Sequence, residues 1–371
     1  MKTQYDIIVA GLGAHGSAAI YQLSKTGKKV LGIDRFHPPH DQGSSHGESR
    51  IIRQAYHESP LYVPLVKAAY PLWEEIEKVS GQALFQRTGG ILLGSKDSRV
   101  VQGAQHSADV HDIPYEYLDE ADIQRRFPAF RPTPGTVGVL EKLAGILFPE
   151  KCIAAHLSAS AAQGAEIKYN EPITHITFHS GSVELTTAQG TYIAEKVIFT
   201  TGAWIGQLFP ELQLPLTIER QVLFWLGHNG PSSLPIFIWE YLPDKMFYGF
   251  PDLGNGMKIA HHHKGRSIQP DELQQDTSPE EIREMQEIAS RYLDIDPVFR
   301  QTRVCMYTNT PDEDFIIDFH PQHSNVILAS PCSGHGFKFS SLIGKILCDM
   351  ALERPIEFDL SPFSIHRPAL L

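Results

Sequence analysis

The stretch from Tyr5 to Asp34 constrains the fold more than any other part of the chain. A short run of mostly apolar, β-prone residues leads into Gly11, Gly13 and Gly16, which are spaced as G-x-G-x-x-G. A helical pattern and a second apolar strand follow, and Asp34 ends that strand. A strand, glycines, a helix, a strand and an acid in this order predict a dinucleotide-binding βαβ unit.

Each residue of this motif has its own expected role. Gly11 allows a tight turn, Gly13 lets the backbone approach a pyrophosphate, and Gly16 lets the helix lie close to the strand. The helix N-terminus offers its free amides and the positive end of its dipole to the phosphates. Asp34 is placed to accept hydrogen bonds from a ribose. The pattern favours a dinucleotide site over a glycine-rich hairpin, and by itself it fits both NAD and FAD.

Length and charge narrow the possible functions. The 371 residues are enough for about two domains with substantial cores. The formal net charge of −11 argues against a general affinity for nucleic acid or for an anionic membrane. No apolar run reaches the roughly 18 residues of a membrane span, and Asp6 within the first strand argues against a signal peptide. We therefore expect no nucleic-acid partner and no membrane association.

The four cysteines indicate a reducing compartment. Cys152, Cys305, Cys332 and Cys348 show neither C-x-x-C spacing nor a dense disulfide pattern. Because disulfides are rare in the cytosol, the simplest interpretation is a cytoplasmic protein.

The rest of the chain contains two kinds of pattern. A loop rich in proline, glycine and small polar residues follows Asp34, and helical periodicity runs from Tyr62 to Val79. The stretch from Leu216 to Ile259 is rich in strand-forming and aromatic residues, which is typical of an antiparallel sheet. Ser278 then begins a strong helix, with proline next and a capping-box glutamate, Glu281, at its third position.

These patterns predict an α/β fold in which a Rossmann-like cofactor domain is interrupted twice by an antiparallel-sheet substrate (catalytic) domain. We assign residues 1–85, 145–214 and 314–371 to the cofactor domain, which is discontinuous. Residues 86–144 and 215–313 form the substrate domain.

From Cys305 onward the sequence resembles a known family. The segments CMYTNTPDEDFIIDFHPQHSNV and SGHGFKFSS are similar to those of the monomeric sarcosine oxidase and N-methyltryptophan oxidase family. SSHGESRIIRQAYHES, TGAW, YGFPD and FSIHRPAL are similar too, so the resemblance covers essentially the whole chain. It implies a Rossmann-like FAD-binding domain and FAD bound covalently through Cys305. Without the resemblance, a lone cysteine in an alternating strand is most often simply buried.

In the first matching segment, His46 corresponds to a family histidine, and Arg50 and Arg53 correspond to two family arginines. The resemblance implies that His46 and Arg50 are catalytic and that Arg53 binds the substrate carboxylate, which a guanidinium can grip at both oxygens. Because Arg50 and Arg53 are three residues apart, they would share one face of a helix.

The middle of the chain supplies further catalytic residues. Tyr248 matches a family tyrosine on the substrate side. Lys258 matches a lysine that would stabilise negative charge as O2 is reduced; the alternative is a strand lysine that points into solvent. His262 matches a family histidine, and a one-residue deletion leaves His261 and His263 as competitors. We expect no metal at this triplet, since alternate side chains leave a strand on opposite faces.

The C-terminal glycine loop completes the expected site. Lys338 matches the lysine of the family's Gly-His-Gly-Phe-Lys motif and would give the substrate carboxylate a second cation. Gly334 and Gly336 would let the backbone approach the flavin ring, and His335 between them would be structural. Tyr307, which would bind substrate, would form a pocket wall.

Three departures from the family pattern bear on the pocket. Ser45 stands where a second histidine is usual, and Glu48-Ser49 replaces an Asp-Thr pair. Pro331-Cys332 replaces a glycine and an aromatic residue next to the glycine loop, which bears on the size of the substrate.

The expected reaction is the oxidation of a secondary (N-methyl) amino acid such as sarcosine, with O2 as acceptor. Its products would be the primary amino acid, formaldehyde and hydrogen peroxide. A bulkier substrate, N-methyltryptophan or a cyclic imino acid, is the alternative, and an NAD-dependent dehydrogenase or a non-catalytic flavoprotein is less favoured. The expected partners are the small-molecule substrate and O2, and the expected state is a monomer.

Overall fold

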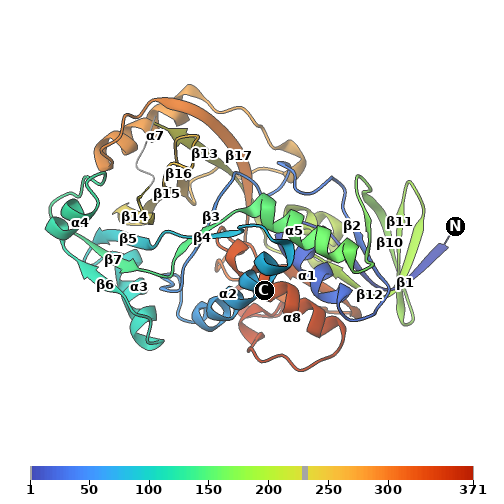
Figure 1. The fold of residues 1–371 in the computed structure, drawn as a ribbon. Coiled ribbons are helices and arrows are strands. Elements are labelled where there is room, and N and C mark those ends of the chain that lie inside the picture. Colours follow the sequence, from blue (N-terminus) through green and yellow to red (C-terminus); the bar gives the residue numbers. More distant parts are fainter. Residues whose placement is uncertain (1, 228–232, 371) are drawn as a thin grey trace.

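The computed structural model describes residues 2–227 and 233–370. Two large sheets lie toward opposite ends of the molecule, with β3 and β4 of a small third sheet between them (Figure 1). Among the described residues, no helix is both long and apolar enough to cross a bilayer. The predicted strand-rich stretch includes residues 228–232, which lie outside the described residues.

The first large sheet contains the predicted βαβ unit. Its parallel part runs β12, β1, β2, β9, with β19 also parallel to β12, and β10, β11 and β18 add antiparallel edges. Helix α1 packs between α5 and α8 and covers this sheet (Figure 1). The bounds are β1 (Lys2–Ala10), α1 (Ala14–Ser24), β2 (Val30–Ile33), α5 (Pro149–Ala162), β9 (Glu166–Lys168), β10 (Ile173–His179), β11 (Ser182–Thr187), β12 (Thr191–Phe199), β18 (Ile316–His320), β19 (His323–Ser330) and α8 (Ser340–Ala351).

The second large sheet has the order β17-β13-β16-β15-β14-β5-β7-β6. It is antiparallel, as expected, except where β14 runs parallel to β5. The two strands lie far apart in the sequence, so no hairpin forces them to be antiparallel. The bounds are β5 (Gly90–Ser95), α3 (Arg99–Val110), β6 (Glu116–Leu118), α4 (Glu120–Arg126), β7 (Thr136–Glu141), β13 (Thr217–Leu226), β14 (Ile236–Leu242), β15 (Lys245–Phe250), β16 (Met257–His262), α7 (Pro279–Tyr292) and β17 (Phe299–Asn309).

Helix α7 begins as predicted. The Ser278 side chain accepts a hydrogen bond from the Glu281 amide, and the Glu281 carboxylate accepts one from the Ser278 amide. Its buried face, with Met285 and Tyr292, joins the aromatic core of the second sheet around Phe247.

The third sheet joins β3 (Arg50–Ile52), β8 (Gly145–Leu147) and β4 (Phe85–Arg87) in antiparallel order. The expectation that Arg50 and Arg53 share a helical face is therefore wrong. Arg50 begins β3, with which β8 pairs through the register of Arg50 with Leu147, and Arg53 directly follows this strand. Helix α2 (Tyr62–Ser80) follows and ends at Gly81, whose φ of 65° is left-handed.

The first large sheet is built from the chain segments that we assign to the cofactor domain, and the second from those that we assign to the substrate domain. The division into two domains itself stays a prediction.

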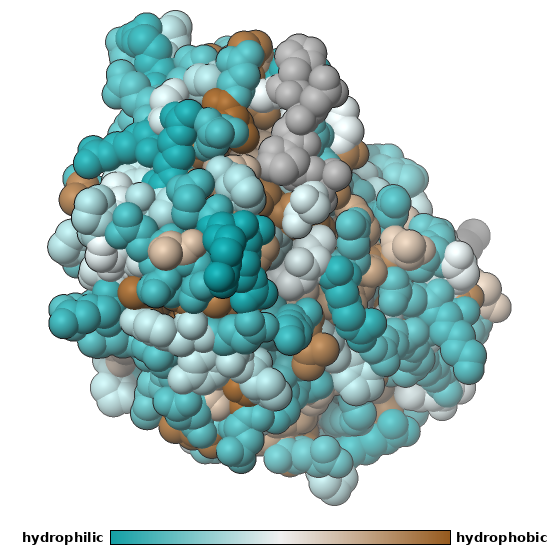
Figure 2. Space-filling view, turned by 60° about the vertical axis from the view of Figure 1, so that its left-hand side comes forward, coloured by the Kyte–Doolittle hydropathy of each residue, from teal (hydrophilic) through white to brown (hydrophobic). Residues whose placement is uncertain are grey.

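On the molecular surface, hydrophilic residues predominate on the face in Figure 2, and apolar residues form small separate groups there. A further short α-helix is α6 (Ile205–Leu208).

Candidate active site

A cavity of about 590 Å³ lies between the two large sheets. Its walls come from the turn after β1, the loop after β2, strand β3, strands β15 to β17 and the glycine loop after β19. Segments from both ends of the chain thus meet around one space, and most of the predicted site residues lie on its wall.

One end of the cavity fits a dinucleotide. Gly11 has φ of 87°, and a Cβ there would lie 2.7 Å from the Thr200 carbonyl oxygen. A Cβ at Gly16 would lie 1.8 Å from the carbonyl oxygen of Gly11, so helix and turn pack as closely as predicted. At Gly13 a Cβ would meet nothing nearer than Ser45 Oγ at 3.8 Å, so this position stays open on the cavity wall.

Asp34 lines the same end of the cavity. Its two carboxylate oxygens accept hydrogen bonds from the amides of Leu12 (2.6 Å) and Phe36 (2.8 Å). These bonds fix the carboxylate beside the glycine turn and leave further lone pairs for a ribose hydroxyl. The glycine cradle and this acid suit a bound dinucleotide such as FAD.

Cys305 lies on the cavity wall in β17, beside Gln221 of β13. The thiol is free and its residue is only 1% exposed. Burial raises the pKa of this thiol, while the neighbouring cations Arg50 and Lys258 act in the opposite direction. The sulfur atom of Cys305 therefore borders the cavity in which the dinucleotide would bind.

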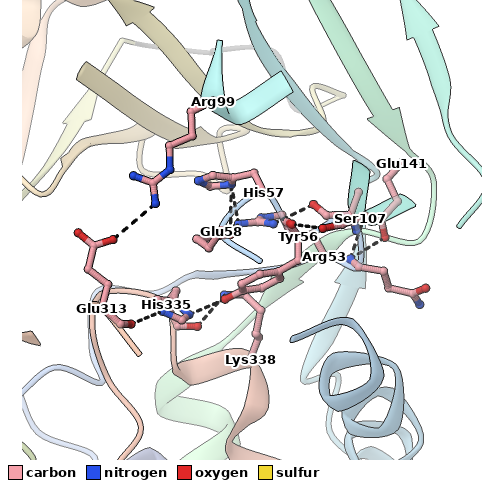
Figure 3. A network of polar contacts seen from close by, with 12 residues as sticks. Arg53, Tyr56, His57, Glu58, Arg99, Ser107, Glu141, Glu313, His335 and Lys338 are labelled. Carbon is pink, nitrogen blue, oxygen red and sulfur yellow. Dashed lines mark hydrogen bonds and ion pairs between the residues drawn. The ribbon is translucent and has the colours of Figure 1, made fainter. Parts of the chain in front are cut away.

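Arg53 and Lys338 converge at another part of the cavity (Figure 3). Both lie against the ring of Tyr56, with the Arg53 guanidinium carbon 4.4 Å and the Lys338 Nζ 5.0 Å from its centroid. Lys338 Nζ donates to the His335 carbonyl (2.6 Å) and to the Tyr56 hydroxyl (3.3 Å). Burial, followed by the charge of Arg53, lowers the pKa of Lys338 to about 7.

Sequence reasoning did not identify the carboxylate that holds Arg53. Glu58 places both carboxylate oxygens within 2.7 Å of Arg53 Nη2, and His57 Nδ1 lies 2.9 Å from the same nitrogen. Burial is the largest single influence on the Glu58 carboxyl and would raise its pKa, but Arg53 together with His57, His335 and Lys338 outweighs burial and holds the pKa well below its usual range. The sequence did contain one signal for this ion pair: Glu58 follows five residues after Arg53, which was expected to bind a carboxylate inside the pocket.

The cavity wall formed by β15, β16 and β17 carries Tyr248, His262 and Tyr307, and the His262 ring lies 5.8 Å from that of Tyr307. Of the three consecutive histidines, His262 is the one on the cavity wall, as the family match implied. His263 instead lies 3.6 Å from Glu219, with a left-handed φ of 51°, and His261 is not part of the lining. Burial lowers the pKa of His262 well below its usual value.

The C-terminal glycine loop closes this end of the cavity. Gly334 has φ of 75°, and a Cβ there would lie 2.7 Å from the Tyr307 ring. A Cβ at Gly336 would lie 1.7 Å from the Pro331 carbonyl oxygen. A side chain larger than hydrogen at either glycine would therefore displace the loop from the cavity wall. Cys332, in the same loop, also lines the cavity.

Lys258 and His46 are not part of the cavity lining. Lys258 Nζ donates to the carbonyls of Gly47 (2.7 Å) and Ser49 (2.9 Å) and to Ser49 Oγ (3.0 Å). Burial lowers the pKa of Lys258, yet three acceptors around one nitrogen favour its protonated form, which alone has three N–H donors. Lys258 thus anchors the loop between His46 and β3.

Arg50 and His46 belong to that loop region. Arg50 lines the cavity, and its guanidinium turns back to the carbonyls of Ser49 (2.8 Å) and Ser44 (2.6 Å). His46 is 2% exposed, and neither ring nitrogen has a hydrogen-bond partner within the described part of the chain. Burial, followed by the Arg50 charge, lowers the pKa of His46 to about 4, so its ring is neutral near pH 7.

Known proteins are similar to this chain over its whole length. The monomeric sarcosine oxidase of Streptomyces avermitilis is 42% identical, over 100% of this chain and 99% of the relative. The N-methyl-L-tryptophan oxidase of Yersinia pestis (strain Pestoides F) is 37% identical, over 98% of this chain and 99% of the relative. These relatives confirm the resemblance found in the sequence motifs.

Solved structures agree on the fold. NikD, described as an unusual amino acid oxidase essential for nikkomycin biosynthesis, has a TM-score of 0.88 at 24% identity and covers 98% of this chain and 97% of its own. Glycine oxidase from Geobacillus kaustophilus has a TM-score of 0.84 at 19% identity, covering 98% and 99%. Residues 6–350 match the family described as FAD dependent oxidoreductase, which sets aside the NAD-dependent alternative. The chain belongs to this family of FAD-dependent oxidoreductases.

Proposed function

We propose that this protein is an FAD-dependent oxidase of a secondary amino acid, with an N-methyl amino acid such as sarcosine as substrate. The observation that carries the proposal is the pair of buried cations, Arg53 and Lys338, on one face of the cavity. Glu58 is the carboxylate paired with Arg53, and a buried charge is costly without a counter-charge, so two cations beside one carboxylate suit a substrate that brings a second carboxylate. The names of the relatives favour the same substrate class.

The bound FAD would accept the hydride from the carbon beside the substrate nitrogen and pass its electrons to O2. Water would then hydrolyse the resulting imine to the primary amino acid and formaldehyde, and O2 would leave as hydrogen peroxide. Gly11, Gly13 and Asp34 would hold the dinucleotide, and Cys305 would bind the flavin covalently. The free thiol on the cavity wall supports this last assignment.

The protein's part is to place the substrate and shape the charge around it. Arg53 and Lys338 would orient the carboxylate, while Tyr248, Tyr307 and His262 would enclose the amine end. These walls carry a hydroxyl or an imidazole, which favours a small, polar substrate over an indole. Arg50 and His46 would act from the loop beside the flavin.

Lys258 would serve the reaction with O2. Because its three N–H groups are all engaged by the loop, it would act through its fixed positive charge. The same bonds hold the loop that carries His46, so we propose both an electrostatic and a positioning role for this lysine.

Two further properties belong to the proposal. We propose a monomer, as the name of the Streptomyces avermitilis relative suggests. We also propose a cytoplasmic location, which the four free cysteines support.

A peroxide assay on the purified yellow protein tests the proposed function. Sarcosine, N-methyl-L-tryptophan and L-proline are compared as substrates, with glycine as the primary-amine control. Hydrogen peroxide should form fastest from sarcosine, and formaldehyde should form in equal amount. A preference for N-methyltryptophan or proline would move the substrate to the alternative classes, and absence of peroxide with all secondary amines would contradict the proposal.

A further inference from the structure

The hydrogen bonds of Arg53 are distributed unevenly in the buried network of Figure 3. Nη1 donates to the Ala55 carbonyl at 2.8 Å. Nη2 faces both oxygens of Glu58, at 2.7 and 2.5 Å. Nε, in contrast, is buried and has no hydrogen-bond partner among the described residues.

This distribution matters because a guanidinium grips a carboxylate with two parallel N–H bonds. Two edges of the group offer such a pair: Nε with Nη2, and Nη1 with Nη2. Both edges include Nη2, whose two N–H groups already face the Glu58 carboxylate and His57 Nδ1. A substrate carboxylate that is held in two-pronged fashion by Arg53 must therefore compete with Glu58.

The burial of charge explains why Glu58 pairs with Arg53. Arg53 is 1% exposed, and the Glu58 side chain is 13% exposed, so each would be a costly buried charge without the other. Lys338 has a carbonyl and a phenol as hydrogen-bond acceptors. The site thus holds two basic groups and one carboxylate at hydrogen-bond distance from Arg53, and a ligand carboxylate would supply the second anion.

We propose that Glu58 is a built-in competitor of the substrate carboxylate and thereby determines affinity and selectivity at this site. It pairs with Arg53 while the site is empty and gives up Nη2 when a carboxylate enters. The inference rests on the proposed function, because it takes the Arg53 end of the cavity as the carboxylate site.

Selectivity follows from this competition. A ligand that grips Nη2 with an anionic group replaces the Glu58 contact with an equivalent one. A ligand that lacks such a group cannot displace Glu58 and leaves the Arg53 pair intact. Glu58 would therefore lower the affinity for all carboxylates while excluding amines that have none.

The substitution Glu58→Gln tests the proposal in the flavin-containing enzyme. The probe is methoxyacetate, a carboxylate without an amine, and its binding is followed by the change in flavin absorbance. The substituted amide side chain would be neutral and a weaker competitor, so the variant should bind methoxyacetate at least about tenfold more tightly than wild type. Unchanged or weaker binding would overturn the proposal and would favour a role of Glu58 toward the substrate amine.

Glu313→Gln is the matched control. Glu313 is a partly exposed carboxylate that pairs with Arg99 at 4.0 Å, in the same network but away from Arg53. Its loss changes the net charge equally and should leave methoxyacetate affinity within about twofold of wild type. A gain in affinity equal to that of Glu58→Gln would mean that net charge alone is responsible.

A second variant keeps the test decisive if Glu58→Gln does not fold. Glu58→Asp keeps the charge on a shorter side chain that reaches Nη2 less well, so it should also bind methoxyacetate more tightly. The experiments distinguish failure of this inference from failure of the proposed function. If only the inference is wrong, the wild type oxidises sarcosine but neither Glu58 variant binds methoxyacetate more tightly. If the proposed function is wrong, the wild type oxidises no secondary amine.

Discussion

Lys338 Nζ lies 3.3 Å from the hydroxyl of Tyr56, which joins the C-terminal glycine loop to the segment after β3. The same hydroxyl lies 2.5 Å from His335 Nδ1, and the Tyr56 ring carries Arg53 on its face. Tyr56 thus fixes the spacing between two cations that are far apart in the sequence. A pocket that binds a small carboxylate requires such fixed spacing.

We expect the flavin to be covalently bound through Cys305. After acid denaturation of the wild type, the yellow colour should remain with the polypeptide, and in Cys305→Ser it should be released. Cys332→Ser is the control, since Cys332 also lines the cavity and its loss should leave the flavin attached. Recovery of free FAD from the denatured wild type would contradict the assignment.

The substitution Lys258→Met should separate the two half-reactions. Negative charge develops on O2 only when the reduced flavin is reoxidised, so removing a fixed cation should slow that step by roughly 10²–10³-fold. Flavin reduction by substrate should stay nearly unchanged in stopped-flow experiments. Equal slowing of both steps would instead show that the bonds from Lys258 to Gly47 and Ser49 matter only for the shape of the loop.

The substitution Arg53→Ala should weaken the binding of a small carboxylate by roughly 10²-fold or more, because breaking a buried ion pair costs about 3–5 kcal/mol. Lys338→Ala should have a milder effect, since Arg53 can still hold both oxygens. The single variant Arg53→Ala also leaves Glu58 without its partner. The change should therefore be repeated in Glu58→Gln, where a loss of affinity of at least about 10²-fold must again appear if Arg53 binds the ligand directly.

Carboxylate binding should depend on the protonation of Lys338, whose pKa is lowered to about 7. The groups that face its ammonium are Arg53, Glu58, Tyr56 and His335. Below pH 7 the ammonium is already charged and affinity should be constant. Above pH 7 binding requires uptake of a proton, so affinity should fall by up to tenfold per pH unit.

Lys338→Arg tests this pH dependence, because a guanidinium stays protonated throughout the range. The decrease in affinity above pH 7 should disappear in this variant. A dissociation constant that rises equally with pH in both proteins would assign the effect to another group.

The dinucleotide end of the site could be predicted from the sequence because its determinants are local. The left-handed φ of Gly11 and the close contact of Gly16 arise within one turn and one helix. The capping box at Ser278 is likewise complete within four residues. Family motifs then placed Cys305 and His262 on the cavity wall, where the structure has them.

Other features depended on pairing between distant parts of the chain. Arg50 to Ile52 forms a strand because β8 supplies its hydrogen-bond partners, and β14 runs parallel to β5 because separate segments meet there. The ion pair between Glu58 and Arg53 likewise depends on how the loop after β3 folds. Short-range patterns determined the turns, caps and helices, since those depend on neighbouring residues. Only the tertiary structure decided which charges meet, because a buried cation takes its partner from whichever segment packing brings within hydrogen-bond distance.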